Sequence, residues 1–189
     1  MRYIVGFLIG IGLIVLTFIL IIRIFSGGGG DESAPRRVDL NSYSTTDTVM
    51  RLTMDGPIVA DAQHQQVRIT VGRDNVLFER FQGYQGDVVD TRNYPNNPDA
   101  YSQFLRALQV SGYTQGNPEG PKDERGYCPT GQRYVYEAIG QGESIIRWWT
   151  TSCGSKQGNF EGKGSAIRGL FKKQVPEYPE LVRRTPFTN

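Results

Sequence analysis

The sequence predicts an α+β fold, in which an N-terminal transmembrane helix is followed by a small antiparallel sheet with helices packed on one face. Three observations lead to this prediction: a long uncharged apolar run at the N-terminus, several runs of alternating apolar and polar residues joined by short turns, and two amphipathic stretches with helical spacing. The predicted element order after the membrane helix is βββ-α-ββ-α. Because short turns join most of the strands, the sheet is expected to be antiparallel.

The N-terminal apolar run has the length of a membrane span. Residues 3–22 carry no charged side chain, and Arg2 and Arg23 stand on either side of them. At ~1.5 Å per residue these positions span ~30 Å, the thickness of the hydrocarbon core of a bilayer. A cleavable signal peptide has an apolar region of only ~7–15 residues and a small-residue cleavage site. We therefore interpret residues 1–25 as an uncleaved anchor and expect residues 3–22 to contact the lipid bilayer.

Gly6 and Gly10 lie four positions apart within this run. This small-xxx-small spacing lets two membrane helices approach closely, and it is typical of transmembrane homodimers. Glycine is also common in membrane helices that do not dimerise. Both a dimeric and a monomeric anchor fit the sequence.

A polar segment connects the anchor to the rest of the chain. Residues 26–47 include four consecutive glycines, four serines and one proline, a composition typical of a flexible tether. We predict a linker over residues 26–47 and a folded domain over residues 48–189.

The sequence pattern in the first half of this domain predicts three strands. Apolar residues alternate with polar ones over residues 50–54 and 67–71, and a turn signal at 72–75 leads into a third run at 76–81. Residues 83–96 are rich in Asp, Asn and Pro, and we expect a loop there.

Helix caps and apolar stripes in the sequence predict two helices. Asn97 is a good N-cap, and Pro98 suits the first helical position. The stripe that should pack on the sheet consists of Tyr101, Phe104, Leu105 and Leu108. A shorter helix is expected over residues 165–174, with Ile167, Leu170 and Phe171 on one face.

A second hairpin spans the two cysteines of the chain. Strand-like runs at 132–139 and 144–151 flank a Gly-bearing turn, which brings Cys128 and Cys153 together at the open end of the hairpin. We predict a disulfide between them, and a disulfide persists in an oxidising compartment. The few flanking charges slightly favour a cytoplasmic C-terminus, but long domains are translocated largely regardless of charge. We therefore predict a cytoplasmic N-terminus and an extracytoplasmic domain.

Catalytic and metal-binding motifs are sparse in this sequence. His64 is the single histidine, and the two cysteines are expected to be bonded to each other, so no zinc ligand set is expected. We expect His64 to be an exposed loop residue, and we predict no catalytic residue and no cofactor. Two groups of loop carboxylates lack the spacing of a calcium loop and are expected to be solvated: Asp87 and Asp90, and Glu119, Asp123 and Glu124.

The charge balance argues against a nucleic-acid-binding protein. Nineteen basic and nineteen acidic residues follow Ile24, whereas nucleic-acid-binding domains carry a basic excess. Only the C-terminal segment is basic, which suits anionic lipid headgroups or an acidic envelope polymer. A solvated helix surface explains the same excess.

Trp148 and Trp149 are adjacent on a predicted strand, so their side chains point to opposite faces of the sheet. Arg147 shares the side of Trp149, and on this ground we expect Trp149 to be the more exposed of the two. Together with Tyr134 and Tyr136 it would form an aromatic binding surface for a sugar or a peptide. Cross-strand packing beneath a loop explains the same pattern.

These observations predict a single-pass membrane-anchored, extracytoplasmic domain with a binding or assembly role at the cell envelope, where its partner would be an envelope polymer or protein. The alternative is a cell-envelope hydrolase. A cleft that holds His64 beside a loop carboxylate would favour this enzyme.

Overall fold

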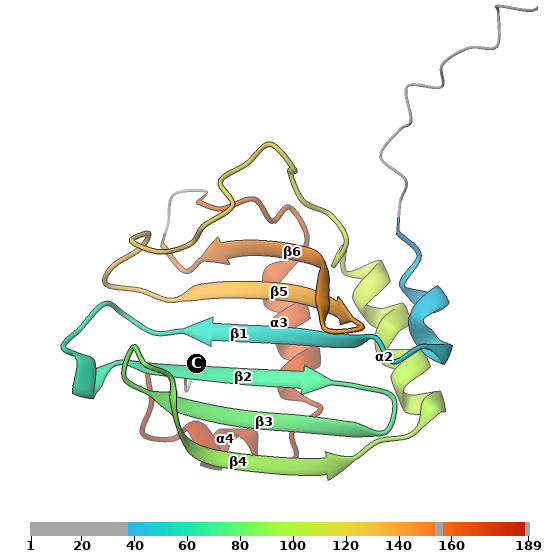
Figure 1. Ribbon diagram of the computed structural model, residues 1–189, viewed down its shortest axis with the longest axis horizontal. Helices are drawn as coiled ribbons and strands as arrows, with labels where there is room; N and C mark the ends of the chain where they lie inside the picture. The colour runs from blue at the N-terminus through green and yellow to red at the C-terminus, as the bar shows by residue number, and fades with distance from the viewer. Residues whose placement is uncertain (1–37, 154–156, 188–189) are drawn as a thin grey trace, which may run out of the picture. The chain divides into compact units, whose positions relative to one another are not determined.

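Six strands form one antiparallel sheet in the computed structural model, which describes residues 38–153 and 157–187 (Figure 1). The strands are β1 (Val49–Asp55), β2 (Gln65–Val71), β3 (Asn75–Gln82), β4 (Asp87–Pro95), β5 (Arg133–Gly140) and β6 (Glu143–Thr151). The α-helices are α2 (Pro98–Val110), α3 (Gly164–Lys172) and α4 (Tyr178–Val182), and two short 3-10 helices are η1 (Leu40–Thr45) and η2 (Asp61–Gln63). The α+β class is therefore confirmed.

The order of strands across the sheet is β4-β3-β2-β1-β5-β6, and every neighbouring pair is antiparallel. The predicted order βββ-α-ββ-α lacks two elements, because residues 87–95 form a strand instead of a loop and residues 178–182 form a helix. β4 is an edge strand with most side chains exposed. Such a strand tolerates Asp, Asn and a terminal Pro, so it gives little apolar alternation to detect.

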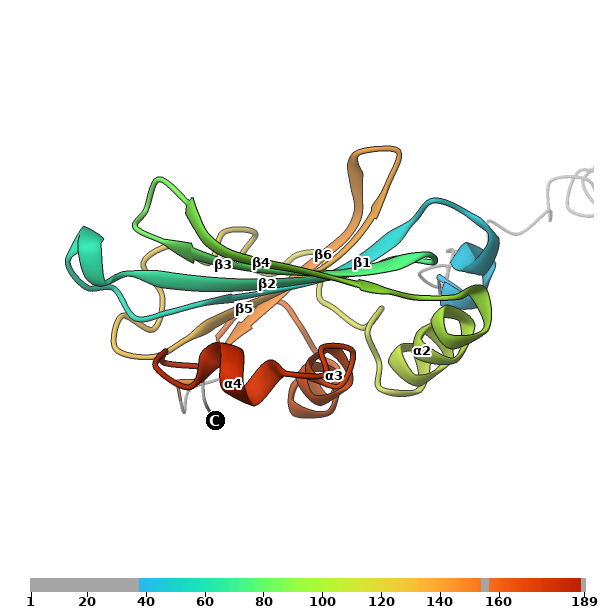
Figure 2. The ribbon, with the colours of Figure 1, turned by 90° about the horizontal axis from the view of Figure 1, so that it is seen from below.

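The α-helices of the described residues, α2, α3 and α4, lie on one side of the sheet, as Figure 2 shows. The main core lies between the sheet and these helices, and alternate residues of the central strands, such as Leu52, Ile69 and Phe78, are fully buried in it. We call α2 together with residues 157–187, which contain α3 and α4, the helix layer, and we call the opposite side of the sheet the open face.

α2 follows its predicted pattern closely. The side chain of Asn97 accepts a hydrogen bond from the main-chain nitrogen of Ala100, Pro98 begins the helix, and all four residues of the predicted stripe are buried. The ring of Phe104 packs edge-on against Phe171 of α3, with centroids 5.1 Å apart.

The folded unit begins at Val38, earlier than expected. Leu40 is fully buried, and its main-chain nitrogen donates to the side chain of Gln109 on α2. The prediction of a flexible linker over residues 26–47 is therefore wrong for residues 38–47. It failed because one buried leucine among polar residues shows no periodicity.

Among residues 38–153 and 157–187, no helix is long and apolar enough to cross a membrane. The predicted span at 3–22, with Gly6 and Gly10, lies outside the described residues.

Candidate functional site

The predicted hairpin and disulfide are confirmed. β5 and β6 are joined by Gln141 and Gly142, both with positive φ, as a tight two-residue hairpin turn requires. Cys128 and Cys153 are disulfide-bonded at the open end. The bond ties the start of β5 to the end of β6 and fixes one end of the long segment between α2 and β5.

This segment, residues 111–132, covers Trp149. The indole nitrogen of Trp149 donates to the main-chain oxygen of Pro121 at 2.6 Å, and the ring of Tyr127 lies 4.9 Å from the indole. Trp149 has no exposed surface, whereas Trp148 packs at the edge of the main core and is half-buried. The prediction that Trp149 is the more exposed tryptophan is wrong, because strand alternation cannot show that a distant loop folds over that face.

Tyr134 and Tyr136 lie on the other face, beneath α3. The exposed fractions are 7% for Tyr134 and 0% for Tyr136. The guanidinium of Arg168 lies 4.0 Å above the ring of Tyr134 and donates to the hydroxyl of Tyr136. The structure therefore does not bring Trp149 and the two tyrosines together as a surface, and the alternative of packing beneath other elements describes all three.

His64 is buried, contrary to the expectation of an exposed loop residue, with 4% of its surface accessible. Its Nε2 lies 2.9 Å from a carboxylate oxygen of Asp55, its Nδ1 lies 3.2 Å from the main-chain oxygen of Pro57, and Tyr84 stacks on the ring. Arg133 binds the other oxygen of Asp55. Both ring nitrogens therefore lie beside oxygen atoms of the chain itself. This geometry holds the chain together and leaves no nitrogen for a substrate.

Two arginines of the open face lie near carboxylates, whereas Arg51 donates to the hydroxyl of Thr70. Arg147 contacts Glu124 at 2.6 Å and Glu137 at 3.7 Å, and Arg68 lies 3.9 Å from Glu79. The charges of Arg68 and Arg147 are therefore balanced by carboxylates of the same face.

Three of the five predicted loop carboxylates, Asp90, Asp123 and Glu124, have basic partners. Asp90 lies 2.7 Å from Arg92, and Arg125 lowers the pKa of Asp123 to about 2 through its hydrogen bonds. In the described part of the chain, no three His, Cys, Asp or Glu side chains gather closely enough to hold a metal ion.

The helix layer carries the basic excess of the protein. Between residues 157 and 187 there are six basic side chains and three acidic ones. The most exposed basic residues of the layer are Arg106, Lys163, Lys173, Arg183 and Arg184. Within the described ranges, none of these five side chains has a hydrogen bond or an ion pair, in contrast to Arg68 and Arg147 of the open face.

Two of these residues flank a shallow groove between α2 and α3. The groove has a volume of about 630 Å³. Ala107, Ala166 and Gly169 contribute small residues to it, and Arg106 and Lys173 add positive charge. Val110 borders it with 80% of its surface exposed.

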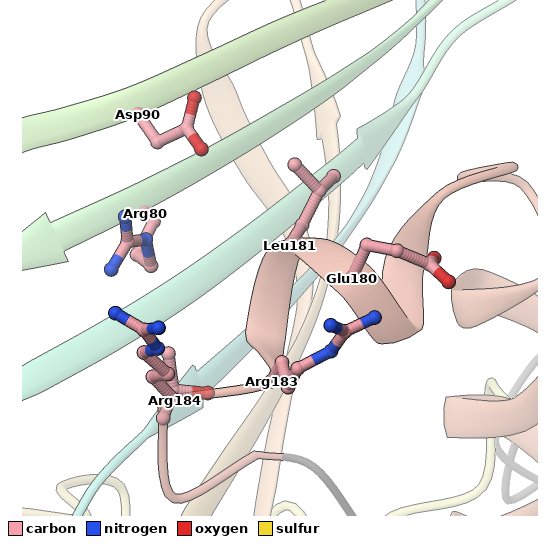
Figure 3. Close-up of a pocket in the computed structure, with 7 residues that line it drawn as sticks. Arg80, Asp90, Glu180, Leu181, Arg183 and Arg184 are labelled. Carbon is pink, nitrogen blue, oxygen red and sulfur yellow. The ribbon is translucent and has the colours of Figure 1, made fainter.

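A second cavity, which we call the arginine cleft, lies between the β3–β4 edge and α4 (Figure 3). It has a volume of about 390 Å³, and it is lined by Arg80, Asp90, Glu180, Leu181, Arg183 and Arg184, with Thr185 beside them. In Figure 3 the guanidinium groups of Arg80 and Arg184 point toward the same space, while Arg183 extends toward Glu180. Two positive charges thus converge from different elements.

The sequence shows the basic C-terminal segment but gives no indication of this convergence. Arg80 follows Val76 and Phe78 at a position that faces the helix layer, where an apolar residue is expected. An arginine at an inward position near a strand end is the signal that could have identified the cleft.

Comparison with known proteins assigns neither a family nor a function to the chain. No protein-family model matches the chain, and no curated protein matches it significantly. Any function must therefore be argued from the residues themselves.

Proposed function

We propose that this chain is a single-pass membrane protein whose folded unit lies outside the cytoplasm and binds an anionic component of the cell envelope through the helix layer. The anchor is supported by the bilayer length of the uncharged run at residues 3–22. The compartment is supported by the bond between Cys128 and Cys153, because disulfides of this kind are rare in reducing cytosol.

The single observation that carries the binding role is the difference between the two faces. Arg68 and Arg147 of the open face have carboxylates within 3.9 Å, whereas the exposed basic side chains of the helix layer have none within the described ranges. Like charges collected on one surface create a field that attracts anions from solution. An acidic polymer or an anionic surface would complement this layer.

The alternative function, a hydrolase that uses His64 as its catalytic base, has no support from the geometry around this side chain. His64 does have a carboxylate neighbour, Asp55, but the ring is buried and each nitrogen has an acceptor in the chain. A general base needs a free nitrogen within hydrogen-bond reach of the substrate.

Binding of the full chain to soluble polymers tests this proposal. The chain would be placed in nanodiscs of uncharged lipid and titrated with poly(glycerol phosphate) and with neutral dextran. We expect saturable binding of the anionic polymer alone, and an affinity that falls as salt rises from 50 to 300 mM, roughly the range over which surface charges become screened. Equal binding of dextran, or no binding of the anionic polymer, would contradict the proposal.

A further inference from the structure

The arginine cleft carries a more specific assignment than the helix layer as a whole. We infer that it is a binding site for a phosphate ester, whose oxyanion lies between the guanidinium groups of Arg80 and Arg184. This inference rests on the proposed function in one respect, since the anionic envelope component would supply the phosphate.

Arg80 provides the first step. It stands on β3 opposite Val67, at a position that points to the helix layer, and its Nε is buried. No atom in the described part of the chain accepts a hydrogen bond from that Nε. A buried donor without an acceptor destabilises the fold, and an oxyanion in the cleft would supply the missing acceptor.

The second step is that neither carboxylate of the cleft, Asp90 or Glu180, forms an ion pair with its arginines in the described residues. Asp90 lies opposite Arg80 in the sheet, but its carboxylate lies 2.7 Å from the guanidinium of Arg92. Within residues 38–153 and 157–187, Arg80, Arg183 and Arg184 have no ion pair. Two guanidinium groups that face one cavity repel each other unless an anion lies between them.

The third step concerns the kind of anion. Two guanidinium groups on different elements can donate to different oxygens of a tetrahedral phosphate, whereas a carboxylate offers two oxygens in one plane. The remaining wall includes the apolar side chain of Leu181 and the carboxylate of Glu180. These suit the carbon chain and the hydroxyl groups of a polyol ester, so glycerol phosphate is the simplest matching probe.

Titration of the full chain in uncharged detergent micelles tests the site. The probes are glycerol 1-phosphate and acetate. Binding of each probe is followed by heteronuclear NMR of the arginine Nε–H groups. We expect glycerol phosphate to shift the Nε–H signal of Arg80 and to bind at least about fivefold more tightly than acetate. Equal affinity for acetate would overturn the assignment to phosphate.

Variants separate this site from general charge. Arg80→Gln with Arg184→Gln should weaken glycerol phosphate binding at least about tenfold. The matched control, Arg73→Gln with Arg125→Gln, removes two exposed charges elsewhere and should leave the affinity within about twofold. Melting curves establish that both proteins are folded. If the double variant unfolds, the single variant Arg184→Gln, which changes an exposed residue, is measured in its place. Equal loss in the control, or unchanged binding in a folded Arg184→Gln variant, would overturn the inference.

Three phosphate sources are then compared: glycerol 1-phosphate, poly(glycerol phosphate), and nanodiscs that contain phosphatidylglycerol. The source that shifts the Arg80 signal at the lowest phosphate concentration is assigned as the ligand. If the polymer does not bind but glycerol phosphate binding depends on Arg80 and Arg184, the site stands and the proposed function fails. If the polymer binds independently of these arginines, the function stands and the site fails.

Discussion

Trp149 and His64 show how single side chains on the open face hold distant segments together. Trp149 bonds Pro121 in the loop that follows α2, and His64 links Asp55 at the end of β1 to Pro57. Both residues are buried, although His64 stands in a polar stretch and Trp149 shares its side of the strand with Arg147. Their burial depends on contacts with segments that are distant in sequence or lie across a turn, which is why residue patterns along one strand could not predict it.

Replacement of Trp149 by Ala should lower the free energy of unfolding by ~3–5 kcal/mol, because it leaves a large cavity beneath the loop. Urea unfolding of the purified protein would measure this loss. The control Val110→Ala changes a residue that is 80% exposed and should cost less than ~0.5 kcal/mol. A loss below ~1 kcal/mol for Trp149→Ala would show that the loop does not cover the indole in solution.

Buried tyrosines should make the protein sensitive to alkali. Burial raises the pKa of Tyr136 to about 12, although the charge of Arg168 opposes this. An unfolded tyrosine ionises near pH 10. The neutral hydroxyl therefore stabilises the fold fully below pH 10, and this stability is lost as the pH rises from 10 toward 12. The size of the effect is ~1.4 kcal/mol per pKa unit.

Ultraviolet absorbance of tyrosinate and circular dichroism, followed together from pH 8 to 12.5, would test this prediction. We expect the absorbance of the buried tyrosines to rise only as the fold is lost, and Tyr136→Phe to shift the unfolding midpoint to higher pH. Complete ionisation near pH 10 with the fold intact would contradict it.

At the scale of helices and strands, the sequence predicted the elements that are determined by contacts between residues close together in the chain. The cap at Asn97 and the stripe on α2 are satisfied within one helix, and the β5–β6 hairpin is set by its own turn. β4 depends on pairing with β3, and α4 depends on packing beneath the sheet through Tyr178 and Val182. These two elements have little periodicity of their own, so the sequence did not predict them.

The disulfide should stabilise the β5–β6 hairpin and the loop before it. A bond that closes 25 residues contributes ~3–4 kcal/mol in the chain-entropy description. Cys128→Ala with Cys153→Ala should lower the free energy of unfolding by about this amount. Urea unfolding would measure the loss, and a parallel experiment on the wild type with reductant serves as control. A double variant as stable as the oxidised wild type would contradict the prediction.

At the scale of the whole molecule, the total charge of +2 hides an unequal distribution. On the open face Arg68 and Arg147 lie near carboxylates, whereas in the described residues the five exposed basic side chains of the helix layer have no ion pair. The sequence indicated a basic C-terminal segment, but only the fold brings Arg80 of β3 next to Arg184. Such a site combines residues about a hundred positions apart, and pattern analysis of one chain cannot predict which of them meet.

The anchor predicted from residues 3–22 should keep the full chain in the membrane. Carbonate extraction of cells that express it should leave the protein in the pellet, because an apolar segment of bilayer length is not released by alkali. A variant with Leu13→Arg and Leu16→Arg should enter the supernatant in part. Release of the unmodified chain, or a mature form that begins near Gly27, would contradict the prediction of an uncleaved anchor.

A comparison of matched charge variants tests the central proposal most directly. One full-length variant replaces Lys173, Arg183 and Arg184 of the helix layer with Gln, and the other replaces Arg73, Lys122 and Arg125, which lie outside it. Binding of poly(glycerol phosphate) would be measured for both in uncharged nanodiscs at 0.15 M salt. We expect the helix-layer variant to lose at least about tenfold in affinity and the control to stay within about twofold of the wild type. Equal losses in the two variants would show that binding follows net charge alone, and the account of the helix layer as a binding surface would be wrong.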